Sequence, residues 1–277
     1  MALKCPVCNS GSIFERQTAS IDLWRCPSCD HCFSDIDSIG EFEEYSPEYL
    51  ENTHQNWFEN PNIALFEIIN QFIRQNNTSA SLVDAGCGNG AFLKYIHNKN
   101  PDMSLTGIDL AKNQDIDGIH FMQGDILTAD FQGKFDYVVS LAVIEHIAEV
   151  RVFIKRLCDL CVPRGFLIIM TLNDRSILYR VARLLHSLGV KTPHERLYSK
   201  HHLNHFNPSS LRRLLAVNNL SLIKLLRHNV PLAAVDLPES SPIANATMLA
   251  GVWGTFLLGR LTGQTYLQTV ICQKADE

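Results

Sequence analysis

From residue 81 onwards, short apolar runs alternate with amphipathic stretches, and this alternation constrains the fold more than any other feature of the 277-residue chain. Strands that alternate with helical stretches are typical of βαβ units, which build a parallel sheet with helices on both faces. The pattern therefore predicts an α/β, Rossmann-like fold with a seven-stranded, mostly parallel sheet. The expected strands are 81–86, 104–110, 119–125, 135–141, 165–171, 220–228 and 265–274, and the expected helices are 57–76, 90–99, 147–162 and 208–218.

The turn after the first expected strand is rich in glycine: residues 82–90 read LVDAGCGNG, with glycines at 86, 88 and 90. Glycines let a ligand approach the backbone, whose free N–H groups at the start of the next helix favour an anionic group. The dinucleotide fingerprint G-x-G-x-x-G places its third glycine one residue later. The turn therefore belongs either to a variant dinucleotide site or to a site for another adenosine-containing ligand.

Acidic residues stand at the ends of three successive expected strands: Asp84, Asp109 and Asp125. Ligands of such sheets bind at the carboxyl ends of the strands, so we expect these side chains in one crevice, although a single strand-end Asp often only caps a helix. Asp109 is placed to accept hydrogen bonds from both hydroxyls of a ribose. Asp125 is placed to accept from the exocyclic amine of adenine, with Ile126 packed against the ring.

The stretches VDAGCGNG, GIDL, GDI, FDYVVSLAVIEHI and VPRGFLIIMTLND resemble, in order and spacing, the motifs of class I S-adenosylmethionine-dependent methyltransferases. The resemblance covers about residues 80–275 and is greatest to small-molecule enzymes such as those of ubiquinone biosynthesis. It implies an antiparallel last strand at 265–274 and in-line transfer of a methyl group that the sulfonium already activates. One departure is Arg164, where the family usually has glycine.

By this resemblance, the glycine-rich turn and the strand ends bind S-adenosylmethionine. Asp84 and residues 86–90 would hold its methionine part, Asp109 would hold its ribose, and Leu141 would close over the site. The implied cofactor-binding residues are Asp84, Gly86, Cys87, Gly88, Gly90, Asp109, Leu110, Asp125, Ile126 and Leu141.

Histidines cluster in residues 198–211, YSKHHLNHFNPSSL, just before an expected helix. In the related enzymes, a segment that ends in His-Phe before such a helix borders the substrate cavity. Transfer to a hydroxyl oxygen, the acceptor that we expect on a small molecule, needs a general base. The alternative is that Asn207 caps the helix and His205 only packs. The candidate catalytic residues, in order, are His205, His202 and His201, with His146 of the EHI motif beside them.

The N-terminus carries two C-x2-C pairs, CPVC and CPSC, in the spacing C-x2-C-x17-C-x2-C. Four thiolates on such knuckles close a tetrahedron around a structural Zn²⁺, and the metal stabilises a segment too short to fold around a hydrophobic core. Asn9 and Asp30, which follow the pairs, tolerate the left-handed conformation that a knuckle favours. We expect Cys32 to pack in the core; His31 is a competing ligand, and free thiols or a metal-free ribbon are the alternatives. The expected zinc ligands are Cys5, Cys8, Cys26 and Cys29.

The chain is thus expected to divide into a zinc ribbon (1–37), a helical linker (38–80) and a methyltransferase domain (81–277) with a helical cap around 172–207. The formal net charge of −5 and the pI of about 6.1 lack the basic excess of nucleic-acid-binding proteins. An RNA methyltransferase that presents its substrate on the ribbon, and a non-catalytic cofactor-binding scaffold, are the alternatives to a small-molecule enzyme.

The N-terminus lacks the apolar core of a signal peptide, and clustered cysteines favour metal binding in a reducing compartment, so a cytoplasmic protein is expected. Residues 243–259 are apolar but shorter than the roughly 20 residues of a membrane span, which predicts a buried or interfacial helix. Residues 175–189 predict an amphipathic helix, either part of the cap or a basic surface for anionic lipid. These two segments favour a hydrophobic acceptor or a peripheral membrane contact.

Overall fold

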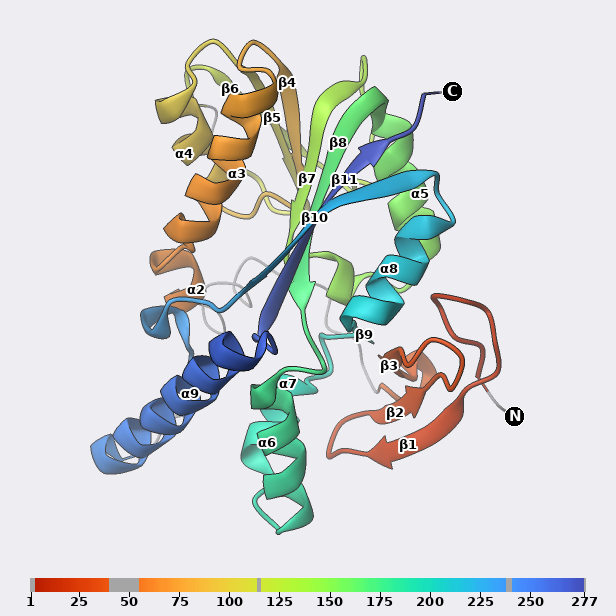
Figure 1. The fold of residues 1–277 in the computed structure, drawn as a ribbon, viewed down its shortest axis with the longest axis vertical. Helices are drawn as coiled ribbons and strands as arrows, with labels where there is room; N and C mark the ends of the chain where they lie inside the picture. Colours follow the sequence, from red (N-terminus) through yellow and green to blue (C-terminus); the bar gives the residue numbers. More distant parts are fainter. Residues whose placement is uncertain (1–2, 40–54, 114–115, 238–240, 277) are drawn as a thin grey trace.

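The computed structural model describes residues 3–39, 55–113, 116–237 and 241–276, and a seven-stranded sheet forms its centre (Figure 1). The strand order is β10-β11-β8-β7-β4-β5-β6; β11 is antiparallel to both neighbours, and the pairs from β8 to β6 are parallel. The predicted α/β class, the seven strands and the antiparallel last strand are therefore confirmed. The strands are β4 (Ser81–Ala85), β5 (Ser104–Asp109), β6 (Ile119–Gln123), β7 (Phe135–Leu141), β8 (Cys161–Leu172), β10 (Leu220–His228) and β11 (Leu267–Lys274).

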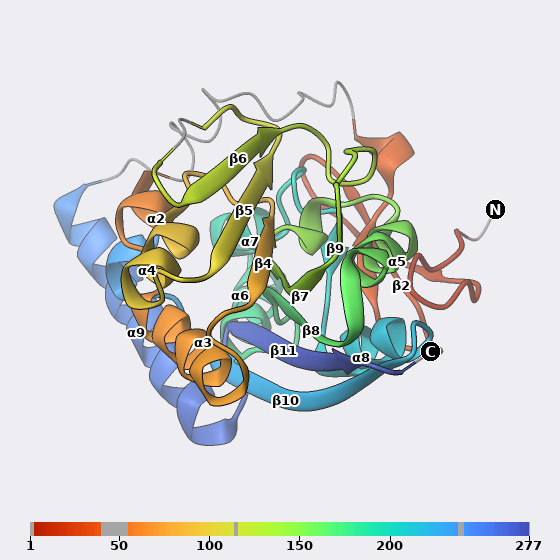
Figure 2. The same cartoon turned by 90° about the horizontal axis from the view of Figure 1, so that it is seen from above.

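Helices cover both faces of this sheet, as Figure 2 shows from above. Helices α3 (Ile63–Asn76) and α4 (Ala91–Lys99) pack on one face, and α5 (Val150–Leu160) and α8 (Pro208–Ala216) pack on the other. The helix expected over 57–76 is instead two helices, α2 (Gln55–Glu59) and α3. Pro61 separates them because a residue before proline avoids helical backbone angles, and Asn62 then caps α3 through the N–H of Leu65.

Three further helices lie beyond the end of the sheet at which β7 and β8 finish: α6 (Ile177–Ser187), α7 (Thr192–Leu197) and α9 (Pro242–Thr262) (Figure 1). The segment expected to be a buried or interfacial helix is α9, and it is not buried. By length and composition alone α9 could cross a membrane, and only 17% of its most apolar window is buried. Its large exposed apolar side chains are Ile243, Trp253, Leu257, Leu258 and Leu261.

The N-terminal segment forms a small antiparallel sheet of β1 (Ile13–Gln17), β2 (Asp22–Arg25) and β3 (Cys32–Ser34), and the two C-x2-C pairs lie in turns outside these strands. A fourth strand, β9 (Asn204–His205), comes from the C-terminal half of the chain and pairs with β3. We call residues 3–39 the ribbon. The ribbon therefore shares a sheet with the large domain, whereas the sequence suggested a separate unit. Of the expected linker, residues 40–54 lie outside the described part of the chain.

Candidate functional site

A cavity of about 960 Å³ opens at the carboxyl ends of the parallel strands. Its wall contains nine of the ten expected cofactor-binding residues, and it also contains three of the four candidate catalytic histidines, His146, His201 and His202. Gly90 is the exception, since it begins α4 as the N-cap and is not in the cavity wall. The nine residues are Asp84, Gly86, Cys87, Gly88, Asp109, Leu110, Asp125, Ile126 and Leu141.

The glycine-rich turn after β4 requires its glycines for conformational reasons. Gly86, Gly88 and Gly90 have φ values of 78°, 52° and 72°, in the left-handed region that residues with a Cβ rarely adopt. A Cβ on Gly86 would also lie 2.4 Å from Cγ2 of Val143, which is too close for real atoms. The turn is held against the next strand because the N–H of Gly86 donates to the carbonyl of Ile108 at 2.8 Å. Glycine is thus required at these positions of the turn, and two of them, Gly86 and Gly88, border the cavity.

Asp84 is the second-last residue of β4, and its carboxyl group is buried, with the residue only 2% exposed. Its Oδ1 has no hydrogen-bond partner among the described residues. Burial, and then the charge of Asp109, raise the pKa of Asp84 to about 8. A buried polar atom without a partner is costly, so an atom of this kind in a cavity wall indicates a position where a ligand donates a hydrogen bond.

Asp109 links the end of β5 to the glycine-rich turn. Its Oδ2 accepts from the N–H of Gly88 at 2.8 Å, and its Oδ1 accepts from the N–H of Ala111 at 3.0 Å. Each carboxylate oxygen has two lone pairs, so Asp109 retains the capacity to accept from a ligand as well. Asp125 in turn accepts from the N–H of Leu127 at 2.9 Å and so closes its own turn. No helix begins directly after Asp125 among the described residues, so its side chain holds a turn and caps no helix.

The remaining cofactor-binding candidates form an apolar part of the wall. Ile126 is buried, whereas Leu110 is 56% exposed at the rim. Leu141 ends β7 and is followed by Ala142, whose φ of 59° is unusual for a residue with a side chain. Such strain at a cavity wall is typical of functional sites, where the surrounding structure holds the backbone in place.

The histidines of the site come from two segments that meet at the cavity. His146 lies in a short 3-10 helix, η2 (Ile144–His146), directly after β7, and His202 follows α7. Their ring centroids are 4.9 Å apart. The Nδ1–H of His146 donates to the carbonyl of His201 at 2.7 Å. Since a carbonyl only accepts, this bond fixes the neutral tautomer of His146 and makes Nε2 its acceptor nitrogen.

His205, the first candidate from the sequence, lies elsewhere. It is completely buried in β9, paired with Cys32, and it is not part of the cavity wall. Its ring packs 4.5 Å from that of Tyr198, and burial lowers the pKa of His205 well below its usual range. The expected helix entry is also present, because Asn207 caps α8 in a capping box. The position of His205 therefore agrees with the alternative in which this histidine only packs in the core. The candidates in contact with the cavity are His146, His201 and His202.

Glu145 is a cavity residue to which sequence reasoning assigned no role. It is 1% exposed, and its Oε2 accepts from the hydroxyl of Thr171 at 2.9 Å. Burial raises the pKa of Glu145 to about 7, although bonds from its own N–H and from Thr171 act in the opposite direction. The EHI motif had already singled out the neighbouring His146, but only the fold shows that both side chains reach the cavity wall.

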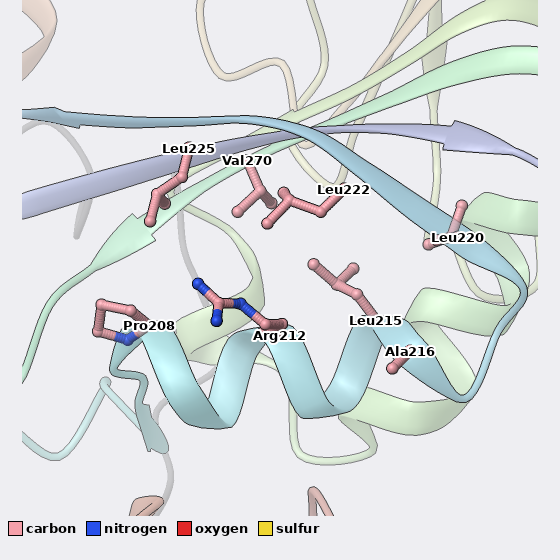
Figure 3. Close-up of a pocket in the computed structure, with 8 residues that line it drawn as sticks. All are labelled: Pro208, Arg212, Leu215, Ala216, Leu220, Leu222, Leu225 and Val270. Atoms are coloured by element: carbon pink, nitrogen blue, oxygen red, sulfur yellow. The ribbon is translucent and has the colours of Figure 1, made fainter.

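The far side of the cavity is apolar and is formed by α6 and α9. Leu178, Val181 and Leu185 come from α6, while Met248, Val252 and Phe256 come from α9. A second, smaller pocket of about 210 Å³ lies between α8 and the strands β10 and β11 (Figure 3). Its lining is apolar apart from Arg212 and contains none of the expected site residues. The larger cavity is therefore the candidate active site.

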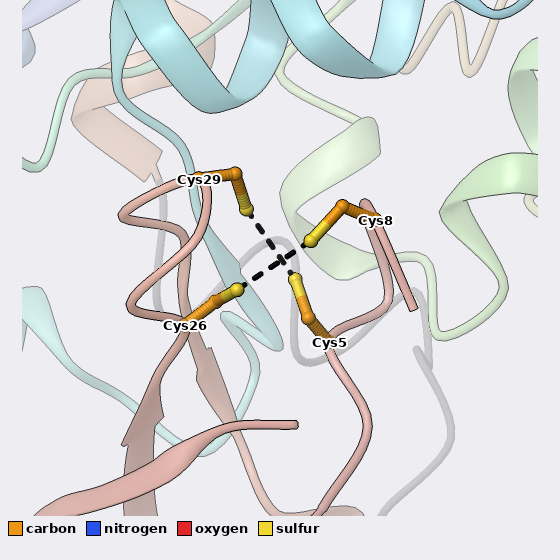
Figure 4. A group of neighbouring side chains, drawn as sticks. All are labelled: Cys5, Cys8, Cys26 and Cys29. Atoms are coloured by element: carbon orange, nitrogen blue, oxygen red, sulfur yellow. Dashed lines mark hydrogen bonds between the residues drawn. The ribbon is translucent and has the colours of Figure 1, made fainter. Parts of the chain in front are cut away.

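The four expected zinc ligands converge in the ribbon (Figure 4). All four sulfur atoms lie within 4.8 Å of one another, and the Cys5–Cys29 and Cys8–Cys26 sulfur pairs are 3.6 and 3.5 Å apart. A zinc–sulfur distance of about 2.3 Å in a tetrahedron separates the sulfurs by roughly 3.8 Å, so the cluster fits Zn²⁺. Asn9 and Asp30 have the predicted positive φ values, 61° and 59°.

The two other residues that were considered as ligands or packing groups do not join this cluster. Cys32 is completely buried in the hydrophobic core, as expected. His31 donates from Nε2 to Oδ1 of Asn204 at 2.9 Å and is not part of the four-sulfur group.

Residues 50–225 match the family described as methyltransferase domain. This segment is more than half of the chain, so the chain belongs to that family, and the resemblance to class I S-adenosylmethionine-dependent methyltransferases is confirmed. The chain is 33% identical over 109 residues to a probable chloroplastic tocopherol O-methyltransferase of rice, matching 35% of this chain and 30% of the rice protein. It is 25% identical over 196 residues to the ubiquinone biosynthesis O-methyltransferase of Rickettsia prowazekii, matching 62% of this chain and 75% of that protein.

The ubiquinone biosynthesis O-methyltransferase of Bartonella tribocorum is 29% identical over 104 residues, which is 33% of this chain and 41% of that protein. The rice and Bartonella proteins are thus matched over less than half of their own length. Among solved structures, phosphoethanolamine N-methyltransferase 2 of Haemonchus contortus superimposes with a TM-score of 0.58 at 15% identity, covering 85% of this chain and 62% of that one. This likeness shows the fold.

Proposed function

We propose that this protein transfers a methyl group from S-adenosylmethionine to a hydroxyl oxygen of a small, apolar acceptor. One observation carries the proposal: a single cavity joins the glycine-rich turn and the acidic strand ends to a histidine pair and an apolar wall. The relatives named above are ubiquinone biosynthesis O-methyltransferases and a probable tocopherol O-methyltransferase, which supports this acceptor class.

The cavity residues fit S-adenosylmethionine. The unpartnered Oδ1 of Asp84 suits the ammonium group of a methionine tail, and Gly86 and Gly88 of the glycine-rich turn border the same cavity. Asp109 would hold the ribose, and Asp125 with Ile126 would hold the adenine. When bound, the cofactor supplies a methyl group on a sulfonium, which is already activated for displacement. The protein contributes mainly proximity and alignment, which can supply about 7–11 kcal/mol.

We assign the general base to His146, with His202 beside it. A base needs an acceptor atom and a fixed orientation, and the bond from Nδ1–H of His146 to the carbonyl of His201 provides both. The Nε2 of His146 then takes the proton of the acceptor hydroxyl as its oxygen becomes the nucleophile. His202 borders the same wall and orients the acceptor.

The assignment is tested with tritiated S-adenosylmethionine and hexylcatechol, a probe that combines a hydroxyl with an apolar tail. We expect transfer to hexylcatechol to exceed transfer to catechol, because α6 and α9 offer apolar surface to the tail. Replacing His146 with Gln should lower kcat by about 10²–10⁴-fold. The affinity for S-adenosylhomocysteine should stay unchanged, and replacing exposed His120 with Gln is the matched control. Methylation of hexylamine but of neither catechol would overturn the choice of oxygen.

A hydrophobic acceptor agrees with a peripheral membrane contact through α9. Exposed leucines and Trp253 line the outside of this helix, while its inner side borders the cavity. The basic surface expected on α6 is reduced, because Arg175 binds Asp30 and Arg183 binds Asp174. We therefore expect insertion of apolar side chains of α9, and not electrostatic attraction, to dominate the binding to a membrane. Co-sedimentation with phosphatidylcholine vesicles should decrease in the double variant Leu257→Ser/Leu261→Ser and not in Leu222→Ser on β10; equal binding of both variants would refute the contact.

We further propose that the ribbon holds one structural Zn²⁺ on Cys5, Cys8, Cys26 and Cys29, and that the protein works in the cytoplasm. The sulfur geometry supports the first statement. All nine cysteines are unpaired, which agrees with a reducing compartment.

A further inference from the structure

The ribbon is joined to the histidine side of the cavity by a shared sheet. Strand β3 pairs with β9 through Cys32↔His205 and Phe33↔Asn204. The N–H of Ser34 donates to the carbonyl of Leu203 at 2.9 Å, and the hydroxyl of Ser34 donates to the carbonyl of His202 at 3.0 Å. The ribbon thus binds the backbone of His202 itself.

A second path reaches His146. His31 of the ribbon donates to Oδ1 of Asn204 at 2.9 Å, and the Nδ2 of Asn204 donates to the carbonyl of Ile147 at 2.7 Å. Both His31 and Asn204 are buried, so water does not compete for these bonds. Because Ile147 directly follows His146, the same ribbon residue restrains both histidine-bearing segments.

A buried carboxylate provides the third connection. Asp174, fully buried after β8, accepts from both terminal nitrogens of Arg25 at 3.1 Å each. It also accepts from Arg183 of α6 at 2.9 Å and from the hydroxyl of Tyr198 at 2.5 Å. Arg25 therefore connects the ribbon to the two segments of the cap that flank the cavity. Removal of Arg25 would leave Asp174 with one cationic partner fewer in a buried position.

The residues that make these contacts surround the second cysteine knuckle. Arg25 precedes Cys26, and Asp30, which binds Arg175 and the Nδ2 of Asn207, follows Cys29. Metal ligation fixes the backbone of a knuckle, since such small segments fold only when the metal is bound. Metal ligation by Cys26 and Cys29 would therefore restrain the backbone that carries Arg25, His31 and Ser34.

We propose that the ribbon is a positioning element for the acceptor side of the cavity, and that its metal occupancy controls the order of the His146 and His202 segments independently of cofactor binding. The inference rests on the proposed function, in which His146 is the general base and His202 orients the acceptor. The cofactor side is assembled within the large sheet: Gly86 and Cys87 bond to Ile108, and Gly88 bonds to Asp109. Loss of the ribbon metal should therefore disorder the His146 and His202 segments without weakening cofactor binding.

The experiment measures three quantities on the full chain: bound zinc, the Kd for S-adenosylhomocysteine, and amide hydrogen exchange in peptides covering 199–207 and 144–148. Metal removal by a chelator should raise exchange in both peptides by about tenfold or more, since local opening follows the loss of restraining hydrogen bonds. The Kd should remain within about twofold, because the cofactor contacts lie elsewhere.

Variants separate positioning from metal binding. Arg25→Met should keep its zinc, raise exchange in residues 199–207 and raise the KM for hexylcatechol by about tenfold. Arg25→Lys keeps the positive charge, so its exchange rate and its KM for hexylcatechol should lie between those of the wild type and Arg25→Met. Arg164→Met, which removes an exposed arginine that pairs with Asp276 at the other end of β8, is the matched control and should change nothing.

Each outcome has one meaning. Unchanged exchange in 199–207 after metal removal would overturn the positioning role, and so would a Kd that rises in parallel with the exchange rate. Absence of S-adenosylhomocysteine binding by the zinc-loaded wild type would instead refute the proposed function, whatever the exchange rates show.

Discussion

Replacing Asp109 with Ala tests the ribose assignment most directly. Its carboxylate already accepts from Gly88 and Ala111, and it has lone pairs for two ribose hydroxyls in addition. Hydrogen bonds to a charged acceptor contribute about 1.5–3 kcal/mol each. Because Asp109 is only partly buried, we take the low end for each of the two bonds, about 3 kcal/mol in total, which corresponds to a roughly 150-fold rise in Kd.

The assay is calorimetric titration with S-adenosylhomocysteine and with its 2′,3′-dideoxy analogue. The variant also frees the N–H of Gly88, so a loosened turn could weaken binding without any ribose contact. The analogue distinguishes the two causes: a ribose contact predicts the large loss for the natural ligand and little for the analogue. Asp109→Asn, which keeps one acceptor oxygen but no charge, should lose roughly 10-fold.

Asp102→Ala is the control, because Asp102 is an exposed carboxylate on the loop before β5. Near-native affinity of Asp109→Ala would refute the ribose assignment. An equal loss for both ligands would also refute it and would leave Asp109 as a support of the glycine-rich turn.

Three further predictions concern Asp84, the glycine-rich turn after β4, and the zinc ligands of the ribbon. Because the pKa of Asp84 is raised to about 8, the folded protein keeps a proton that the unfolded chain releases above about pH 4. This group's contribution to stability is therefore lost as the pH rises from about 4 to about 8, and Asp84→Asn should flatten that fall in Tm measured by calorimetry; parallel Tm profiles would contradict it. Gly86→Ala should lower stability by more than about 1 kcal/mol in urea and weaken cofactor binding, since a methyl group meets Val143 and the φ of 78° is strained. Cys26→Ser should release about one zinc per chain, measured by elemental analysis, while S-adenosylhomocysteine still binds; unchanged zinc content would refute the ribbon site.

The sequence predicted most of the large sheet because the relevant physics is local. Alternating apolar runs set the strands, and only glycine suits the positive φ values of the turn after β4. A local rule also explains why the predicted 57–76 helix is wrong: Pro61 divides it into α2 and α3, and the apolar periodicity alone does not show this break.

The histidines show where local reasoning ends. His205 and His202 are three residues apart in a segment that is partly extended, and the sequence spacing does not tell which of them faces a cavity. The pairing of β9 with β3 turns His205 into the core and leaves His202 at the wall. That pairing joins residues more than 170 positions apart, so it depends on the packing of the whole chain.

The sequence by itself therefore determined the fold class, the methyl-donor motifs and the cysteine spacing, because each depends on residues close together in the chain. Only the tertiary structure decided that the ribbon shares a sheet with the large domain, that His146 and His202 meet at one wall, and that α9 stays exposed. These features arise from contacts between distant segments. Their free energy depends on which surfaces are buried together, and neither periodicity nor spacing records that.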